Sequence, residues 1–101
     1  MTVLIVQYRI RDDARPELDA AVGRLMAAVA EAAPDGVRYT LGTLPDGVTV
    51  VGLLELEDGA ENPLPGIPEA GAFQRDLAGW VVGDPPAPVR LDELGSYGRN
   101  A

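Results

Sequence analysis

The stretch 48–57, VTVVGLLELE, has the most distinctive pattern of apolar and polar positions in the chain. Side chains in a strand point alternately to opposite faces of the sheet. Both faces of this stretch are mostly apolar: one would carry Val48, Val50, Leu54 and Leu56, and the other Val51 and Leu53. Two apolar faces are typical of a strand that is covered on both sides. The pattern therefore predicts a central strand.

Residues 2–11 show the same pattern in their first half, where alternate residues on both faces are apolar. They predict a second central strand, in which Tyr8 and Ile10 share a face. Residues 89–97 alternate only weakly, with Val89 and Leu91 on one face, and predict an edge strand at the end of the chain.

A hairpin is predicted in the middle of the chain. Residues 37–44 read as a strand of mixed polarity, and Pro45-Asp46-Gly47 separates them from 48–57. Because this tripeptide is typical of a tight turn, the two strands should pair in antiparallel fashion.

Two segments show the spacing of three and four residues that is typical of an amphipathic helix. The first runs from Pro16 to about Ala33, and its apolar positions are Leu18, Val22, Leu25, Met26 and Val29. The second begins at Pro68, carries Phe73, Leu77 and Trp80 at i, i+4 and i+7, and has Gly83 as its predicted C-terminal cap. Residues 58–67, rich in Gly and Pro, predict a loop before it.

The resulting order, β-α-β-β-α-β, is the ferredoxin-like α+β plan with an antiparallel four-stranded sheet. In that plan the first and third strands are central, as the two apolar segments require. The length of the chain fits a single domain over residues 1–101. Two helices cover only one face of such a sheet, so the face with Val3 and Ile5 would be exposed. We predict that a second copy covers it in a homodimer, sheet against sheet.

Composition excludes several kinds of chemistry. The chain has no Cys, no His and no Lys. These absences exclude zinc sites of the usual type, triads based on His or Cys, and Schiff-base catalysis. We expect no metal and no cofactor. The carboxylates, Arg, Tyr and Trp that remain would suit an enzyme whose substrate supplies the reactive electrons.

The formal net charge is −8 at pH 7, with the acidic residues spread along the chain. Nucleic acids and anionic membranes bind clustered Lys and Arg, so we expect neither as a partner. No apolar run approaches the roughly 18 residues that cross a bilayer, and no basic segment precedes an apolar one at the N-terminus. We therefore expect a cytoplasmic protein.

The pattern resembles the dimeric α/β-barrel proteins, and within them the antibiotic biosynthesis monooxygenase-like family. The resemblance spans residues 2–97 and rests on the strand VLIVQYRI, a helix ending in Pro34-Asp35-Gly36, the long strand 48–57, Ala72-Phe73, and the closing Ser96-Tyr97-Gly98. It implies a cavity between the sheet and helices of each subunit, and cofactor-independent oxidation of an aromatic or quinol-like compound. Haem-degrading relatives use a His on the second helix, which this chain lacks. The Trp that many relatives carry after the third strand is also absent, because Glu55-Leu56-Glu57 stands there.

The candidates for lining such a cavity are Tyr8, Arg38, Tyr39, Asn62 and Trp80. Tyr8 should face the helices, where its hydroxyl needs a partner from the backbone, water or a ligand. Trp80 is favoured as a core residue, with cavity lining as the alternative. Arg38 and Tyr39 either reach a ligand anion or decorate an edge strand, and Asn62 either contacts a ligand or serves a turn. No catalytic residue is assigned.

Two functions are compatible with these observations. The first is an oxidoreductase, a cofactor-independent monooxygenase acting on an aromatic or quinol-like small molecule. It predicts an apolar cavity with a few polar groups at its wall, and a space filled by Leu, Met, Phe and Trp would contradict it. The second is a non-catalytic dimeric module that binds a small ligand or serves in assembly. It predicts a solid core, or a pocket without converging polar groups.

Overall fold

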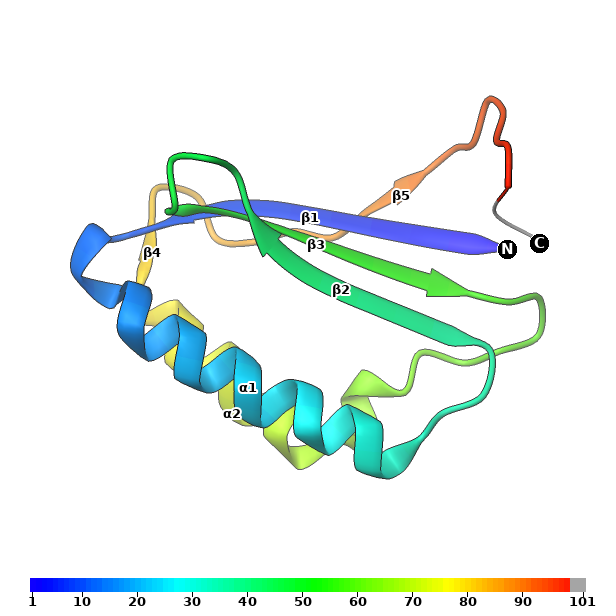
Figure 1. Ribbon diagram of the computed structural model, residues 1–101, viewed down its shortest axis with the longest axis horizontal. Coiled ribbons are helices and arrows are strands. Elements are labelled where there is room, and N and C mark those ends of the chain that lie inside the picture. The colour runs from blue at the N-terminus through cyan, green and yellow to red at the C-terminus, as the bar shows by residue number, and fades with distance from the viewer. Residues whose placement is uncertain (99–101) are drawn as a thin grey trace.

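The computed structural model describes residues 1–98, in which two helices cover one face of an antiparallel sheet (Figure 1). The elements in chain order are β1 (Thr2–Ile10), the 3₁₀ turn η1 (Asp12–Ala14), α1 (Arg15–Ala32), β2 (Val37–Thr43), β3 (Thr49–Leu56), the 3₁₀ turn η2 (Leu64–Gly66), α2 (Pro68–Ala78), β4 (Val81–Val82) and β5 (Val89–Leu91). The strand order is β2-β3-β1-β4, and β5 also pairs with β1. The predicted ferredoxin-like α+β class is confirmed, with both predicted central strands at the centre. Residues 99–101, the end of the predicted domain, lie outside the described residues.

The inner face of the sheet, which packs against the helices, is set by the pairing of β1 with β3. In this register Tyr8 lies opposite Val50, and Val6 lies opposite Gly52. The buried core under the helices consists of Tyr8, Ile10, Ala14, Leu18, Ala21, Leu25, Val48, Val50, Ile67, Ala70, Phe73 and Leu77. The apolar alternation of the two central strands therefore supplies one half of the core, and the helix stripes supply the other.

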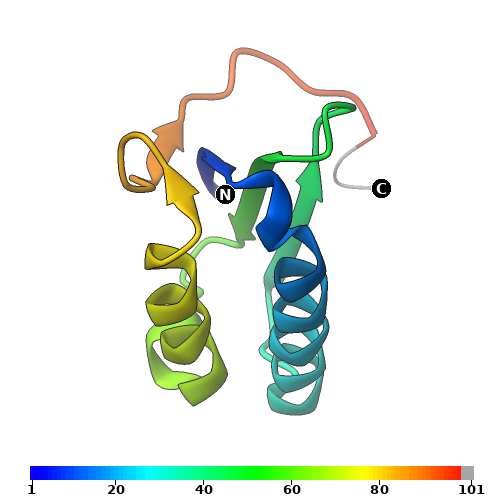
Figure 2. The same ribbon diagram turned by 90° about the vertical axis from the view of Figure 1, so that its left-hand side faces the viewer.

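The two helices lie side by side beneath the sheet (Figure 2). α1 has Pro16 in its first turn, where the missing N–H is tolerated, and its C-cap is Ala33, whose backbone is left-handed with φ of 46°. Its buried residues, Leu18, Ala21 and Leu25, follow the predicted three- and four-residue spacing. No helix within residues 1–98 combines the length and apolar character needed to cross a membrane.

The outer face of the sheet, on the side away from the helices, is also largely apolar. Its apolar residues are Val3, Ile5, Val51, Leu53, Val82, Val89 and Leu91. Val3 is 3% exposed, whereas Val89 is 59% exposed. Arg38 and Glu55 form an ion pair on this face, with 3.8 Å between Nη1 and Oε2. After β5 the chain arches over the outer face (Figure 2).

The final strand is shorter than predicted and is divided in two. β4 pairs with Arg9 and Ile10, and β5 pairs with Val3–Ile5 of the same strand, so the ladder is interrupted between them. The intervening segment 83–88 contains three prolines, which cannot donate ladder hydrogen bonds, and Gly83 adopts a left-handed φ of 86°. Beyond Leu91, residues 92–98 form no strand, although the predicted strand extended to residue 97.

The prediction that the second helix continues through Trp80 to a cap at Gly83 was wrong. α2 ends at Ala78, Gly79 is its C-cap, and Val81 already belongs to β4. Gly79 weakens the helix, and the β-branched Val81 and Val82 pair with β1 instead. The carbonyl oxygen of Trp80 accepts the Arg11 N–H at 3.0 Å, which fixes the chain as it leaves the helix.

Candidate functional site

A groove of about 480 Å³ opens between the inner face of the sheet and the helices. We call it the Tyr39 groove. Its lining residues are Leu25, Tyr39, Asn62, Leu64, Pro65, Ile67, Pro68, Ala70, Gly71, Phe73, Gln74, Arg75 and Pro88. This volume falls in the range of sites that bind small organic molecules. A second cavity, beside Arg15 between β2 and α1, measures only about 150 Å³.

The floor of the groove is the edge of the hydrophobic core. Leu25 of α1 and Phe73 of α2 are 1% and 4% exposed, and Ile67 and Ala70 are also buried. At this end of the molecule the loop 57–67 and η2 lie between β3 and α2 (Figure 1). The helices and sheet are therefore bridged here by a loop rather than by packed side chains of regular elements, and a groove results.

The loop that borders the groove is held in place by backbone bonds. The Glu57 N–H donates to the Gly36 carbonyl oxygen at 2.8 Å, and the Ala60 N–H donates to the Glu57 carbonyl oxygen at 2.9 Å. Asn62 Oδ1 then accepts the Leu64 N–H at 3.0 Å, a turn that precedes η2. Because Oδ1 is engaged in this turn, the Asn62 amide group is orientated by the backbone, and its NH₂ group can serve as a donor.

Tyr39 of strand β2 is the lining residue of the groove that carries a phenol hydroxyl. Burial raises the pKa of Tyr39 above its ordinary value of 10.0, because the charged form is poorly solvated there. The phenol is therefore neutral at physiological pH and can donate a hydrogen bond to a ligand oxygen.

The charges at the groove favour a neutral or anionic ligand. Arg75 is the only charged residue among its lining residues within the described chain, in a protein whose net charge is −8. The Arg75 guanidinium lies over Gly71, and its Nη1 is 3.6 Å from the position that a Cβ atom at Gly71 would take. Within residues 1–98, no group of three or more acidic side chains converges as a metal site would require.

The structure brings Tyr39 and Asn62 together in the groove and places the other three candidates elsewhere. Tyr8 lies on the same inner face of the sheet but is buried within the core. Trp80 packs against the core just beyond the C-terminal end of α2 and does not line the groove. Arg38 lies on the outer face, paired with Glu55.

Sequence analysis missed Gln74, Arg75 and Pro88 as groove residues. A partial signal existed, because Gly71, Gln74 and Arg75 recur at spacings of three and four and so share one side of α2. Pro88 is 24 residues from Leu64 in the sequence, and no local pattern indicates that the two meet at one groove.

No family model matches the sequence, and no curated protein matches it. Several solved structures, however, are similar to this chain in fold. Rv0793 from Mycobacterium tuberculosis has a TM-score of 0.69 at 24% identity, and the match covers 94% of this chain and 96% of that one. The monooxygenase ActVA-Orf6 of Streptomyces coelicolor, solved with nanaomycin D, has a TM-score of 0.66 at 18% identity, covering 95% and 89%.

SnoaB, a cofactor-independent oxygenase from Streptomyces nogalater, has a TM-score of 0.69 at 14% identity, and the match covers 97% of both chains. Identities this low establish a shared fold and leave activity open. Two further solved structures, described as antibiotic biosynthesis monooxygenases, have TM-scores of 0.70 and 0.67 at 18% and 15% identity. The resemblance noted in the sequence is therefore confirmed at the level of the fold.

Proposed function

We propose that this protein is a cofactor-independent monooxygenase that binds an aromatic or quinol-like small molecule in the Tyr39 groove. The observation that carries the proposal is the groove itself, with an apolar floor and three kinds of polar group at its wall. These are the Tyr39 hydroxyl, the Asn62 amide and the Arg75 guanidinium. The space between sheet and helices is thus filled by core side chains at one end and open at the other.

The available residues suit this chemistry because they can orient a substrate and stabilise its charge. With no Cys, His or Lys in the chain, a covalent step on those side chains is excluded. In the proposed reaction on an anthrone, the CH₂ group of the substrate becomes a carbonyl. One atom of O₂ enters the substrate, and the other leaves as water with the two hydrogens. The substrate supplies all the electrons, and the protein supplies donors for its anion.

Two structural neighbours support this reading of the groove. One is a monooxygenase that binds nanaomycin D, and the other is a cofactor-independent oxygenase. Both align over more than nine tenths of this chain.

The test is oxygen uptake in the presence of a panel of aromatic quinols and anthrones, followed by mass spectrometry of products formed under ¹⁸O₂. We expect uptake with at least one compound and one ¹⁸O atom in its product. Asn62→Ala and Tyr39→Phe should lower the rate, whereas Tyr97→Phe, which changes a fully exposed tyrosine, should not. Absence of uptake with every compound, in a protein that binds them, would refute the proposal.

That outcome would favour the second candidate, a non-catalytic module that binds a small ligand. One observation favours this candidate: the groove residues include no carboxylate and no other ordinary general base within the described chain.

We also propose that the protein is a homodimer that pairs through the outer face of the sheet. Support comes from the apolar residues of that face, of which Val82, Val89 and Leu91 are 49%, 59% and 44% exposed. An exposed apolar sheet face of this kind marks an interaction surface, and a two-fold arrangement would let each copy cover the other.

A further inference from the structure

Arg75 carries a positive charge at the Tyr39 groove that no acidic side chain of the described chain pairs with. Arg11, Arg15 and Arg38 each form an ion pair with an acidic residue. Arg75 forms none within residues 1–98, although the chain has 16 acidic and only 8 basic residues. An arginine left without an acidic partner in such a protein is available to bind an anion from outside the chain.

The position of the Arg75 guanidinium favours a role at the groove over a role at the end of the helix. Arg75 lies in the last turn of α2, where a positive charge complements the helix dipole. Its Nη1, however, is 3.6 Å from the position that a Cβ atom at Gly71 would take, one turn nearer the N-terminus. Gly71 is itself a lining residue of the groove. The charge therefore lies beside the groove and away from the terminal carbonyl groups of α2.

The acidic residues of α2 lie beside a different cavity. Glu69 and Asp76 line a cavity of about 220 Å³ between the two helices, together with Arg24 of α1. Neither of these acids lines the Tyr39 groove, and Glu61 of the neighbouring loop does not line it either. Within the described chain, an anion in the groove would thus meet a guanidinium but no carboxylate among the lining residues.

The remainder of the groove suits an aromatic ring system. Its floor is apolar and includes Leu25, Ile67 and Phe73, all of which are buried. Its walls include Pro65, Pro68 and Pro88. Proline side chains lose almost no conformational entropy when a ligand covers them. The volume of about 480 Å³ is sufficient for a ligand with fused rings.

We propose that Arg75 determines specificity by binding the carboxylate group of an aromatic acid in the Tyr39 groove. The planar guanidinium can donate two parallel hydrogen bonds to a carboxylate, and the rings then lie on the apolar floor. This inference rests on the proposed function and specifies its substrate class as an anthrone or quinol that bears a carboxylate. The carboxylate takes no part in the oxidation. It fixes the position of the ring system in the groove.

The test compares 2-naphthoate with 2-naphthamide, which has the same rings and nearly the same shape but no charge. Dissociation constants are measured by titration calorimetry under nitrogen, so that no oxygen is consumed. We expect the wild-type protein to bind the naphthoate about 3- to 10-fold more tightly than the naphthamide. This preference should weaken as the salt concentration is raised, because salt screens exposed charges.

Arg75→Gln should abolish the preference by weakening the binding of naphthoate, and it should leave the dissociation constant of naphthamide unchanged. Arg24→Gln is the matched control. It removes the same charge from an exposed residue that lines the cavity between the helices, so it should keep the preference. Equal losses in the two variants would show that net charge is responsible, and would overturn the proposal.

A second pair of variants keeps Arg75 and tests the place of its guanidinium. Gly71→Glu puts a carboxylate four residues before Arg75, where opposite charges pair on a helix, and it should abolish the preference. Gly71→Gln adds a side chain of the same size without a charge and should keep it. Both substitutions raise helix propensity, so α2 should be retained. The same preference in both variants would overturn the proposal, as would a wild-type protein that does not bind naphthoate more tightly than naphthamide.

These outcomes are separable from those of the proposed function. A protein that shows the Arg75-dependent preference but consumes no oxygen with any compound would support the carboxylate site and refute the monooxygenase. A protein that oxidises neutral and carboxylate-bearing quinols with the same kcat/KM would support the monooxygenase and refute the carboxylate site.

Discussion

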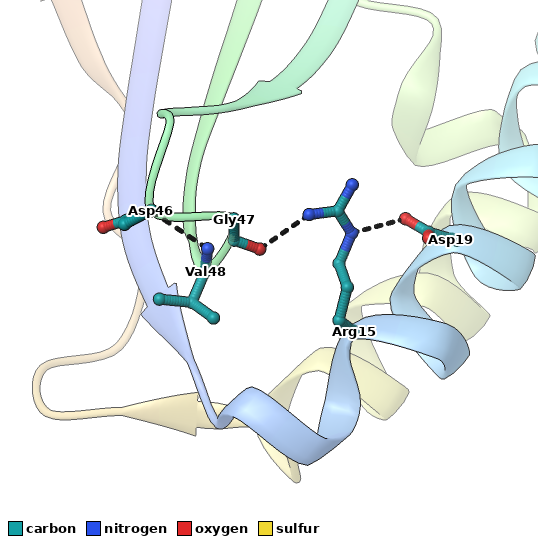
Figure 3. A network of polar contacts seen from close by, with 5 residues as sticks. All are labelled: Arg15, Asp19, Asp46, Gly47 and Val48. Atoms are coloured by element: carbon teal, nitrogen blue, oxygen red, sulfur yellow. Dashed lines mark hydrogen bonds and ion pairs between the residues drawn. The ribbon is translucent and has the colours of Figure 1, made fainter.

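The Arg15 guanidinium joins the first turn of α1 to the β2–β3 hairpin through the carbonyl oxygen of Gly47, to which its Nη1 donates at 2.7 Å (Figure 3). Its Nε donates to Asp19 Oδ1, also at 2.7 Å, one helical turn further on. The bond to Gly47 connects residues 32 positions apart in the chain. It therefore links a helix to a strand pair that local sequence alone would leave independent.

We expect Arg15→Ala to lower the free energy of unfolding by about 1 kcal/mol, because one partly buried charged hydrogen bond and one exposed ion pair are lost. Arg24→Ala, on the exposed side of the same helix, is the matched control and should change stability by less than about 0.5 kcal/mol. Urea unfolding measures the free energy of unfolding of both variants. Equal effects from the two substitutions would show that the link to Gly47 contributes nothing.

Asp46 in the hairpin turn should contribute to stability in a manner that depends on pH. Its side chain accepts the Thr49 hydroxyl at 2.6 Å and the N–H groups of Thr49 and Val48 at 2.8 and 3.0 Å. These bonds lower the pKa of Asp46 from 3.8 to about 2. A carboxyl group whose pKa is lower in the folded than in the unfolded protein stabilises the fold above pH 3.8. That contribution is lost as the pH falls towards 2.

Asp46→Asn should therefore flatten the fall in stability between pH 4 and pH 2, since the amide accepts hydrogen bonds but does not titrate in this range. The measurement is the unfolding temperature across that interval. Asp84→Asn, an exposed aspartate in segment 83–88, is the control and should keep the wild-type slope. If Asp46→Asn kept that slope as well, the turn would not be the source of the dependence.

Replacement by alanine should change the stability of the protein in opposite directions at two glycines. At Gly52 a Cβ atom would lie 2.8 Å from Val6 Cγ1, so Gly52→Ala should destabilise the protein by about 1–3 kcal/mol through overpacking. At Gly23, within α1, no atom beyond the adjacent residues and the backbone of the helix itself lies within 4 Å of the added Cβ atom, and Gly23→Ala should stabilise by about 0.5–1 kcal/mol through helix propensity. Urea unfolding of both variants tests the pair, and a loss of stability at Gly23 would contradict the second prediction.

A charge on the outer face should separate the proposed dimer. We expect Leu53→Arg to sediment as a monomer at micromolar concentration while wild type sediments as a dimer, because an arginine at the centre of this face would be desolvated without a partner. Leu44→Arg is the control: Leu44 is 43% exposed, lies beyond the end of β2, and should leave the dimer intact. A monomeric wild type would remove the basis of the proposal.

The architecture was predictable from sequence because the central strands, β1 and β3, carry apolar residues on both faces. The end of α2 was not, because Phe73, Leu77 and Trp80 keep a helical spacing past the point at which the helix stops. There the pairing of Val81 and Val82 with β1 prevails over the local pattern. A tertiary contact of this kind leaves no trace in the spacing of apolar residues.

For the groove, the sequence indicated Tyr39 and Asn62 as candidates but gave no means of placing them at one site. Their meeting depends on the path of loop 57–67 between β3 and α2. Arg75 and Pro88 join them through the packing of α2 and of the segment before β5. Loop paths are set by tertiary packing, so a groove built from loops is the part of the structure that sequence patterns describe least.

The interrupted ladder on β1 also has a consequence for solubility at high concentration. Between the partners of β4 and β5, no strand within residues 1–98 lies beside residues 6–8 of β1 on that side. An open strand edge is a template on which another chain can add and begin to aggregate. Here Pro85, Pro86 and Pro88 occupy the segment that spans the interval, and none of them can donate a backbone hydrogen bond. The segment that divides the last strand thus places poor hydrogen-bond donors next to the edge that an incoming strand would use.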